Sequence, residues 1–147
     1  MLKHQTVIGF DFGLKHIGVA VGQTVTATAN PLASLHAHQG TPKWEKVTEL
    51  VAYWKPDAFI VGLPYALDGS EHHITRYARR FAQELEMRYP FPVHLVDERF
   101  TTLEARRDLF ERGGSRALSK RHIDGMSAKI ITEDGLNRVL SASIHPL

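Results

Sequence analysis

The chain has 147 residues, of which 43% are hydrophobic and 23% are charged, as is typical of a globular protein with one domain. It contains no cysteine, so disulfide bonds and thiolate metal sites are excluded. The N-terminus lacks the apolar segment of a signal peptide, and no apolar run is long enough to span a membrane. We therefore expect one cytoplasmic domain over residues 1–147, with a C-terminal tail of about eight residues.

The charges are distributed unevenly along the chain. The formal net charge at pH 7 is only +2, yet residues 99–121 contain seven Lys or Arg against three Asp or Glu. A basic stretch of this kind suits a polyanionic partner such as nucleic acid. A solvated helix face with internal salt bridges explains the same pattern equally well.

Three strands are predicted at the start of the chain. Residues 6–12 are rich in β-branched and aromatic side chains, and residues 17–23 alternate apolar with small ones, so both are typical of strands. The short turn between them makes the pair an antiparallel hairpin. Residues 25–35 are a third candidate strand, in which Pro31 indicates a bend or a sheet edge.

Helices and strands alternate in the rest of the chain. Thr41 and Pro42 have the pattern of an N-cap and a first-turn proline, and Pro56 ends the helix that they open. The predicted elements are a helix over 43–54, a strand over 58–64, a helix over 71–89, a strand over 91–98, a helix over 103–113 and a final helix from residue 124. This order predicts an α/β fold with a mixed sheet, antiparallel at first and crossover-connected later.

Several side chains on the first two helices are interpreted as structural. Trp44 and Trp54 fall at helical spacing and are expected in the core rather than on a base-stacking surface. The second helix has one apolar face, formed by Ile74, Tyr77, Ala78, Phe81 and Leu85. Its Arg76, Arg79 and Arg80 could touch phosphate, but a solvated face is the simpler interpretation.

Asp11 is the first of three carboxylates in unexpected places, because it lies between Phe10 and Phe12 in an apolar strand. Burying an isolated carboxylate costs several kcal/mol unless it has a strong partner or a bound cation. The ordinary alternative is an Asp at the end of its strand that hydrogen-bonds the turn at Gly13.

The other two candidates also lie at the ends of elements. Asp97 and Glu98 follow an apolar strand at its C-terminal end, where α/β sheets hold ligands, although a surface charge cluster with Arg99 is the alternative. Strand alternation allows only one of these two acids to share a site with Asp11, and the pattern leaves both open. Asp124 precedes the final helix, where an N-cap is the simpler role.

Three carboxylates from separate elements fit one metal-binding constellation. Oxygen ligands without cysteine favour Mg²⁺ or Mn²⁺. Two such ions about 4 Å apart activate a water molecule and stabilise the leaving oxygen in phosphodiester hydrolysis. The sequence therefore suggests a two-ion nuclease site beside a basic surface.

The segments "DFGLKHIGVAVG", "IVGLPYALDGSEHHIT", "VDERFTTLEAR" and "ID..SA.II" occur in this order along nearly the whole chain. With these segments the chain resembles the YqgF/RuvX family of the RNase H-like superfamily. Members of that family are described as Holliday junction resolvases and as nucleases of ribosomal RNA precursors. The resemblance implies an α/β, RNase H-like fold with a five-stranded mixed sheet, its first three strands antiparallel, flanked by helices.

The resemblance also implies a set of site residues. Asp11, Glu98 and Asp124 match the acidic metal-binding positions, which selects Glu98 over Asp97. Asp68-Gly69 matches a loop that faces the site, or is simply a tight turn, and Met126 departs from the small residues usual after the last acid. The positions that match around the site are Lys15, Arg99, Thr101 and Thr102, and the basic stretch adds the nucleic-acid-binding candidates Arg106, Arg116, Lys120 and Arg121.

The substrate implied by the resemblance is either an RNA precursor or structured DNA. Maturation of the 5′ end of pre-16S rRNA is the favoured reading, because junction resolution requires a symmetric dimer and the sequence has no clear dimer signature; we expect a monomer or a homodimer. Two other function classes are weighed against it. Actin-like ATPases share the Asp-x-Gly hairpin but need two such domains, and a non-catalytic nucleic-acid-binding module would be expected to lack one of the acids.

Overall fold

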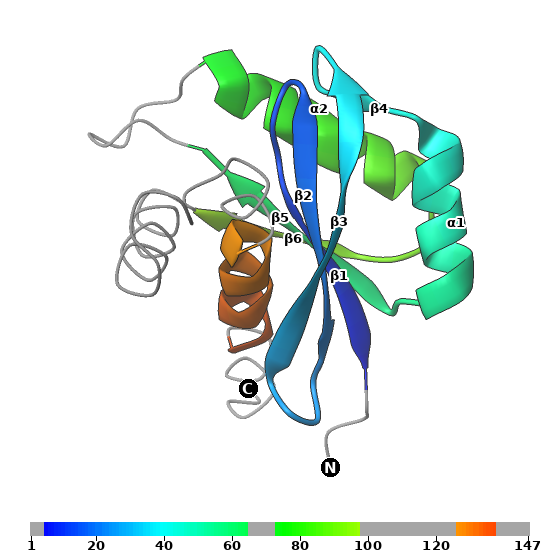
Figure 1. Ribbon diagram of the computed structural model, residues 1–147, viewed down its shortest axis with the longest axis vertical. Coiled ribbons are helices and arrows are strands. Elements are labelled where there is room, and N and C mark those ends of the chain that lie inside the picture. The colour runs from blue at the N-terminus through cyan, green and yellow to red at the C-terminus, as the bar shows by residue number, and fades with distance from the viewer. Residues whose placement is uncertain (1–4, 65–72, 98–125, 138–147) are drawn as a thin grey trace.

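The computed structural model describes residues 5–64, 73–97 and 126–137. Six strands form one sheet in the order β4-β3-β2-β1-β5-β6 (Figure 1). The strands are β1 (Thr6–Asp11), β2 (His16–Gln23), β3 (Thr28–His38), β4 (Thr41–Pro42), β5 (Ala58–Leu63) and β6 (Val93–Asp97). The helices are α1 (Trp44–Trp54) and α2 (His73–Arg88), and residues 126–137 are also helical.

The strand directions agree with the sequence prediction. β1 pairs antiparallel with β2, and β2 pairs antiparallel with β3. On its other side β1 pairs parallel with β5, which pairs parallel with β6. Pro31 lies in the part of β3 that has no second partner strand among the described residues, which is where a proline is tolerated in a sheet.

The sheet has one strand more than the five that were predicted. β4 pairs with the end of β3, and the two residues between them, Gln39 (φ 50°) and Gly40 (φ 81°), both have positive φ. Two such residues make the tight turn of a β-hairpin. The prediction that Thr41 and Pro42 begin a helix was therefore wrong, because the turn before them directs them into a strand.

The first helix is shorter than predicted at its start and ends where predicted. α1 has Lys43 as its N-cap, and no side-chain hydrogen bond caps it. At the other end Lys55 has a left-handed backbone (φ 48°), and its N–H donates to the carbonyl of Val51 at 2.8 Å. Pro56 follows and cannot continue the helix. None of the helices in the described part of the chain is long and apolar enough to span a membrane.

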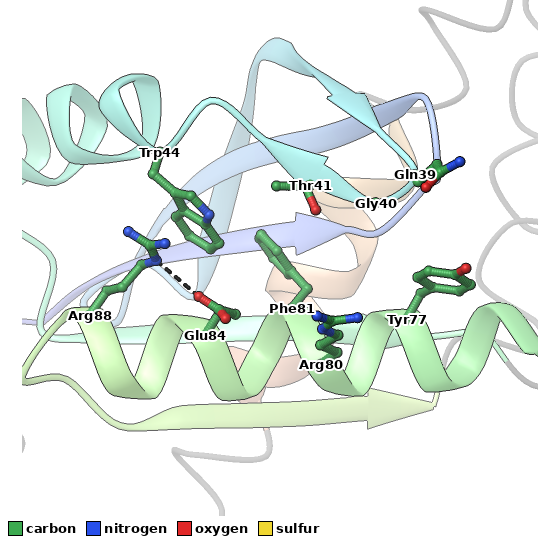
Figure 2. Close-up of a pocket in the computed structure, with 9 residues that line it drawn as sticks. All are labelled: Gln39, Gly40, Thr41, Trp44, Tyr77, Arg80, Phe81, Glu84 and Arg88. Atoms are coloured by element: carbon green, nitrogen blue, oxygen red, sulfur yellow. Dashed lines mark hydrogen bonds and ion pairs between the residues drawn. The ribbon is translucent and has the colours of Figure 1, made fainter.

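A groove lies between the β3–β4 turn, the start of α1 and the exposed side of α2 (Figure 2). Its volume is about 230 Å³. Tyr77 was predicted on the buried face of α2, but its side chain is 37% exposed and lines this groove. The lining residues are Gln39, Gly40, Thr41, Trp44, Tyr77, Arg80, Phe81, Glu84 and Arg88.

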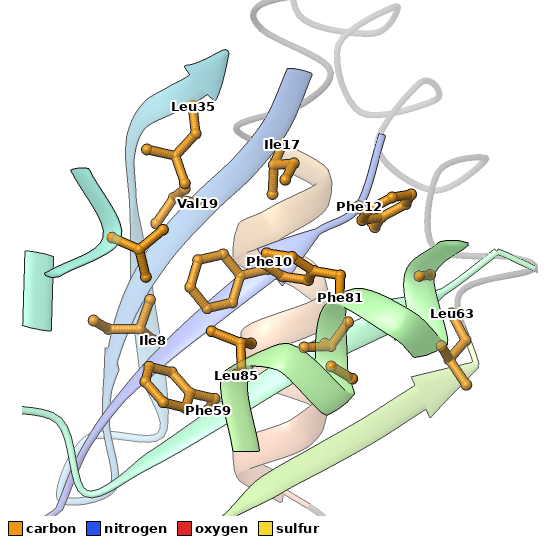
Figure 3. Packing of buried hydrophobic residues seen from close by; sticks show 14 residues of the cluster. Ile8, Phe10, Phe12, Ile17, Val19, Leu35, Phe59, Leu63, Phe81 and Leu85 are labelled. Atoms are coloured by element: carbon orange, nitrogen blue, oxygen red, sulfur yellow. The ribbon is translucent and has the colours of Figure 1, made fainter. Parts of the chain in front are cut away.

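The main core lies between the sheet and the two helices α1 and α2 (Figure 3). Phe10 of the central strand packs edge-on against Phe81 of α2, with ring centroids 5.3 Å apart, and against Phe59 of β5 at 5.9 Å. Trp44 and Trp54 pack against this cluster as partly buried residues. Residues 126–137 cover the opposite face of the sheet, where they pack on a second, smaller cluster.

Candidate functional site

Asp11 is the last residue of β1, and the residues beside it on the two neighbouring strands are both glycines. Its register partners are Gly18 of β2 on one side and Gly62 of β5 on the other. The Asp11 side chain is only half-buried. Carboxylate oxygens are ligands that Mg²⁺ and Mn²⁺ prefer. Asp11 is therefore a candidate ligand for a divalent metal ion.

The register also decides which face of the sheet carries Asp11. Residues in register on neighbouring strands share a face, so Asp11 lies on the same face as Gly62 and its partner Val96. Val96 belongs to the cluster under residues 126–137. Asp97 is in register with Leu63, which belongs to the core under α1 and α2, and so lies on the opposite face from Asp11.

The helix formed by residues 126–137 lies along β1, with its N-terminal end nearer Asp11 and its C-terminal end nearer the start of the strand. Leu136 belongs to one cluster with Val7 near the start of the strand. Thr132 lies directly against Gly9 in the middle of the strand, where a Cβ atom on Gly9 would be 1.8 Å from the Thr132 hydroxyl oxygen. The helical turns before Thr132 therefore lie closer to Asp11 than Thr132 does. The N-terminal end of the helix points to the end of the sheet where Asp11 lies.

Ser127 lies in the first described turn of this helix, at the end nearer Asp11. Its side chain is fully buried, and its hydroxyl oxygen has no hydrogen-bond partner within the described part of the chain. Leaving a buried hydroxyl unpaired costs about 1–3 kcal/mol. Ser127 thus places a polar oxygen at this end of the helix, which sequence reasoning did not single out.

Three further polar residues, Lys15, His16 and His36, lie at the same end of the sheet as Asp11. Lys15 is exposed in the β1–β2 turn, and its carbonyl accepts a hydrogen bond from Ala37 at 2.8 Å. His16 lies two residues before Gly18 in β2 and therefore on the Asp11 face. It is in register with His36, and the two rings are 5.1 Å apart. Sequence reasoning missed this pair, because only the strand register brings the two histidines together.

Most of the predicted site residues lie outside the described part of the chain. These are Asp68, Gly69, Glu98, Arg99, Thr101, Thr102, Arg106, Arg116, Lys120, Arg121 and Asp124, and the predicted tail lies outside it as well. Within residues 5–64, 73–97 and 126–137, no three Asp, Glu or His side chains form a metal-binding cluster. The structure thus describes Asp11 and Lys15 from the predicted set.

Two solved structures of similar fold are those of RuvC from Thermus thermophilus. The structure with a Holliday junction substrate has a TM-score of 0.58 and 15% identity, and covers 93% of this chain and 96% of that one. A second RuvC structure has a TM-score of 0.54 and 14% identity, and covers 92% and 96%. At this identity the likeness shows the fold, and it confirms the RNase H-like prediction.

Closer relatives carry the name "Putative pre-16S rRNA nuclease". The one from Pectobacterium carotovorum is 51% identical over 132 residues, which is 90% of this chain and 95% of the relative. The one from Coxiella burnetii is 51% identical over 131 residues, 88% and 90% of the two chains, and that from Legionella pneumophila is 48% identical over 131 residues, 89% and 94%. Residues 5–138 also match the model of the family described as "RuvX: Holliday junction resolvase". The chain therefore belongs to the RuvX family.

Proposed function

We propose that this protein is a divalent-metal-dependent endonuclease that hydrolyses phosphodiester bonds in the maturation of the 5′ end of pre-16S rRNA. The observation that carries the proposal is the position of Asp11, a half-buried carboxylate between Gly18 and Gly62. Its family and the names of relatives about half identical to it supply the substrate class. Its fold is shared with RuvC from Thermus thermophilus, which was solved in complex with a Holliday junction substrate.

The proposed metal ligands are Asp11, Glu98 and Asp124. Glu98 is favoured over Asp97 because the resemblance selects it, and because the register of β6 places Asp97 on the face of the sheet opposite to Asp11. Asp124 is favoured because it comes two residues before the described helical segment, whose N-terminal end points to the Asp11 edge.

The three acids would hold two Mg²⁺ or Mn²⁺ ions, which supply an activated water molecule and stabilise the leaving oxygen. In the hydrolysis, the water oxygen forms a bond to phosphorus, and the bond from phosphorus to the leaving sugar oxygen breaks. Lys15, which is exposed beside Asp11, and Arg99 would neutralise the scissile phosphate. The basic residues of the 99–121 stretch would bind the flanking backbone, as cationic surfaces do in nucleic-acid-binding proteins.

A cleavage assay tests this proposal directly. The wild type and Asp11→Asn each receive a pre-16S rRNA fragment, a four-way DNA junction and single-stranded controls, with Mg²⁺, with Mn²⁺ and with EDTA. We expect metal-dependent cutting of the RNA precursor by the wild type, and loss of cutting in Asp11→Asn with an unchanged far-UV circular dichroism spectrum. Equal cutting by Asp11→Asn would refute the mechanism.

Asp97→Asn is a matched control, because it removes the same charge at the same sheet edge but on the opposite face. It should retain most of the activity, whereas Glu98→Gln should lose it. Loss of activity in Asp97→Asn together with retained activity in Glu98→Gln would place the metal site on the Asp97 face of the sheet instead.

The second candidate function is Holliday junction resolution, which the description of the family favours. It predicts preferential cutting of the four-way junction in the same assay. It also predicts a two-fold symmetric dimer, since two strands must be cut, so a measured mass of one chain would exclude it. Binding of RNA or DNA without cutting would instead support a non-catalytic binding module.

A further inference from the structure

Among the described residues that line the groove between the β3–β4 turn and α2, Tyr77 has an aromatic ring and Arg80 a positive charge that no other described side chain engages. Tyr77 is 37% exposed, and its ring and hydroxyl have no ring contact or hydrogen bond with the described residues. Arg80 is exposed one helical turn later, and it too has no ion pair or hydrogen bond within the described ranges. Residues three apart on a helix are neighbours on its surface, so the two side chains present a ring beside a positive charge.

The other aromatic and charged residues of the groove are already engaged. Trp44 stacks on Phe81 with ring centroids 5.7 Å apart and an angle of 17°. Arg88 lies on the other side of the Trp44 ring (Figure 2). Its guanidinium carbon is 4.3 Å from the ring centroid. Arg88 also forms an ion pair with Glu84 at 3.0 Å, so the one carboxylate among the described lining residues is neutralised. Trp44 therefore lines the groove with its ring already in contact with Phe81 and Arg88, in agreement with its interpretation as a core residue. Tyr77 is the described aromatic side chain of the groove that remains available for stacking.

One end of the groove is fixed to the segment that follows Asp11. The N–H of Gly40 donates to the carbonyl of Leu14 at 2.9 Å. A Cβ atom on Gly40 would lie 2.6 Å from the ring of Phe12, so the β3–β4 turn packs directly on the residue after Asp11. The groove therefore lies on the face of the sheet opposite to Asp11, and its Gly40 end contacts the segment that follows Asp11.

We propose that this groove binds one unpaired nucleotide of the RNA substrate, on the face of the sheet opposite to Asp11. The base stacks on Tyr77, its phosphate pairs with Arg80, and the polar groups of Gln39 and Thr41 face the base edge. Stacking on an aromatic ring combined with a nearby cation is how proteins hold single strands. This inference rests on the proposed function and extends it, since it requires RNA as the partner but no particular metal chemistry.

The test is the affinity for a short single-stranded RNA, measured by fluorescence anisotropy in EDTA so that the RNA stays intact. Tyr77→Ala should weaken binding about 5- to 150-fold, the range of one lost base stack, and Tyr77→Phe should bind like the wild type because it keeps the ring. Arg80→Gln should make the slope of log affinity against log salt shallower by about 0.7.

The matched controls are Tyr53→Ala, an exposed tyrosine on α1 that lies outside the groove, and Arg76→Gln, an exposed cation on α2 that does not line it. Both should bind RNA like the wild type. Equal affinities for the wild type and Tyr77→Ala would overturn the proposal, as would an Arg76→Gln effect as large as that of Arg80→Gln, or a wild type that does not bind the RNA.

The binding and cleavage assays separate the two proposals. A protein that binds RNA through Tyr77 but cuts nothing contradicts the nuclease proposal and supports the groove. A protein that cuts RNA but binds it equally well without the Tyr77 ring supports the nuclease proposal and overturns the groove.

Discussion

The contact between Gly9 and Thr132 allows a quantitative prediction. A Cβ atom on Gly9 would lie 1.8 Å from the Thr132 hydroxyl oxygen and 2.8 Å from Thr132 Cβ. Because the second atom is fixed by the helix backbone, rotating the Thr132 side chain does not relieve the overlap. Real Cβ contacts essentially never fall below 3.0 Å, so Gly9→Ala must separate strand and helix or distort both.

The expected cost of Gly9→Ala is about 2 kcal/mol in the free energy of unfolding. Overpacking in a core costs about 1–3 kcal/mol, and a contact as short as 1.8 Å belongs at the upper end of that range. Replacing a strand glycine recovers about 0.5–1 kcal/mol of backbone entropy, which leaves about 2 kcal/mol. For a chain of this length, the net loss lowers the melting temperature by about 4–8 °C. Urea unfolding followed by far-UV circular dichroism measures the change.

Thr132→Ala tests whether the overlap with Thr132 causes the loss of stability. It removes the hydroxyl oxygen and leaves Cβ, at 2.8 Å, as the nearest atom. The double variant should therefore be more stable than the two single effects predict, by about 1–2 kcal/mol, the coupling expected for side chains in contact. Gly9→Ala within about 0.5 kcal/mol of the wild type, or a double variant that shows simple additivity, would refute the close packing of helix on strand. Cleavage by Gly9→Ala should also fall at temperatures where the protein is folded, because the helix end moves relative to Asp11.

Three further substitutions test other parts of the fold. Phe81→Ala should cost about 3–5 kcal/mol in urea unfolding, because the ring is only 3% exposed and packs on the main core. Gly40→Ala should cost about 1–3 kcal/mol, since it combines a φ of 81° with an overlap with Phe12; equal melting temperatures would contradict this. Asp57→Ala should cost about 1 kcal/mol, because the Asp57 carboxylate accepts a hydrogen bond from the N–H of buried Thr6 at 2.9 Å, and Asp57→Asn should lose less.

The sequence was sufficient for the β1–β2 hairpin and for the parallel strand β5, because both depend on local patterns. Alternation of apolar and small residues identifies the hairpin, and a short apolar run before a long helix identifies β5. The position of Asp11 at the end of its strand follows from the same patterns. Its relation to Gly18 and Gly62 does not, because it depends on the register between strands far apart in the sequence.

The errors came from competing local signals. Thr41-Pro42 has the pattern of a helix start, but the Gln39-Gly40 turn before it outweighs that pattern. Tyr77 has helical spacing with Phe81, yet it lines the groove and remains exposed. Strand alternation alone left Asp97 and Glu98 open, because it says only that their faces differ, and the resemblance selected Glu98. The pairing of Asp97 with Leu63 supplies the face of Asp97.

The C-terminal helix has a consequence for synthesis on the ribosome. Glu133 accepts a hydrogen bond from the N–H of Ala29, a contact that spans 104 residues, whereas the β1–β2–β3 meander closes between neighbours in the chain. As translation proceeds from the N-terminus, the strands and α1 can associate long before residues 126–137 are made. The sheet face that carries Asp11 is thus covered later than the other face, and a nascent chain gains this half of its structure only after residues 126–137 have been made.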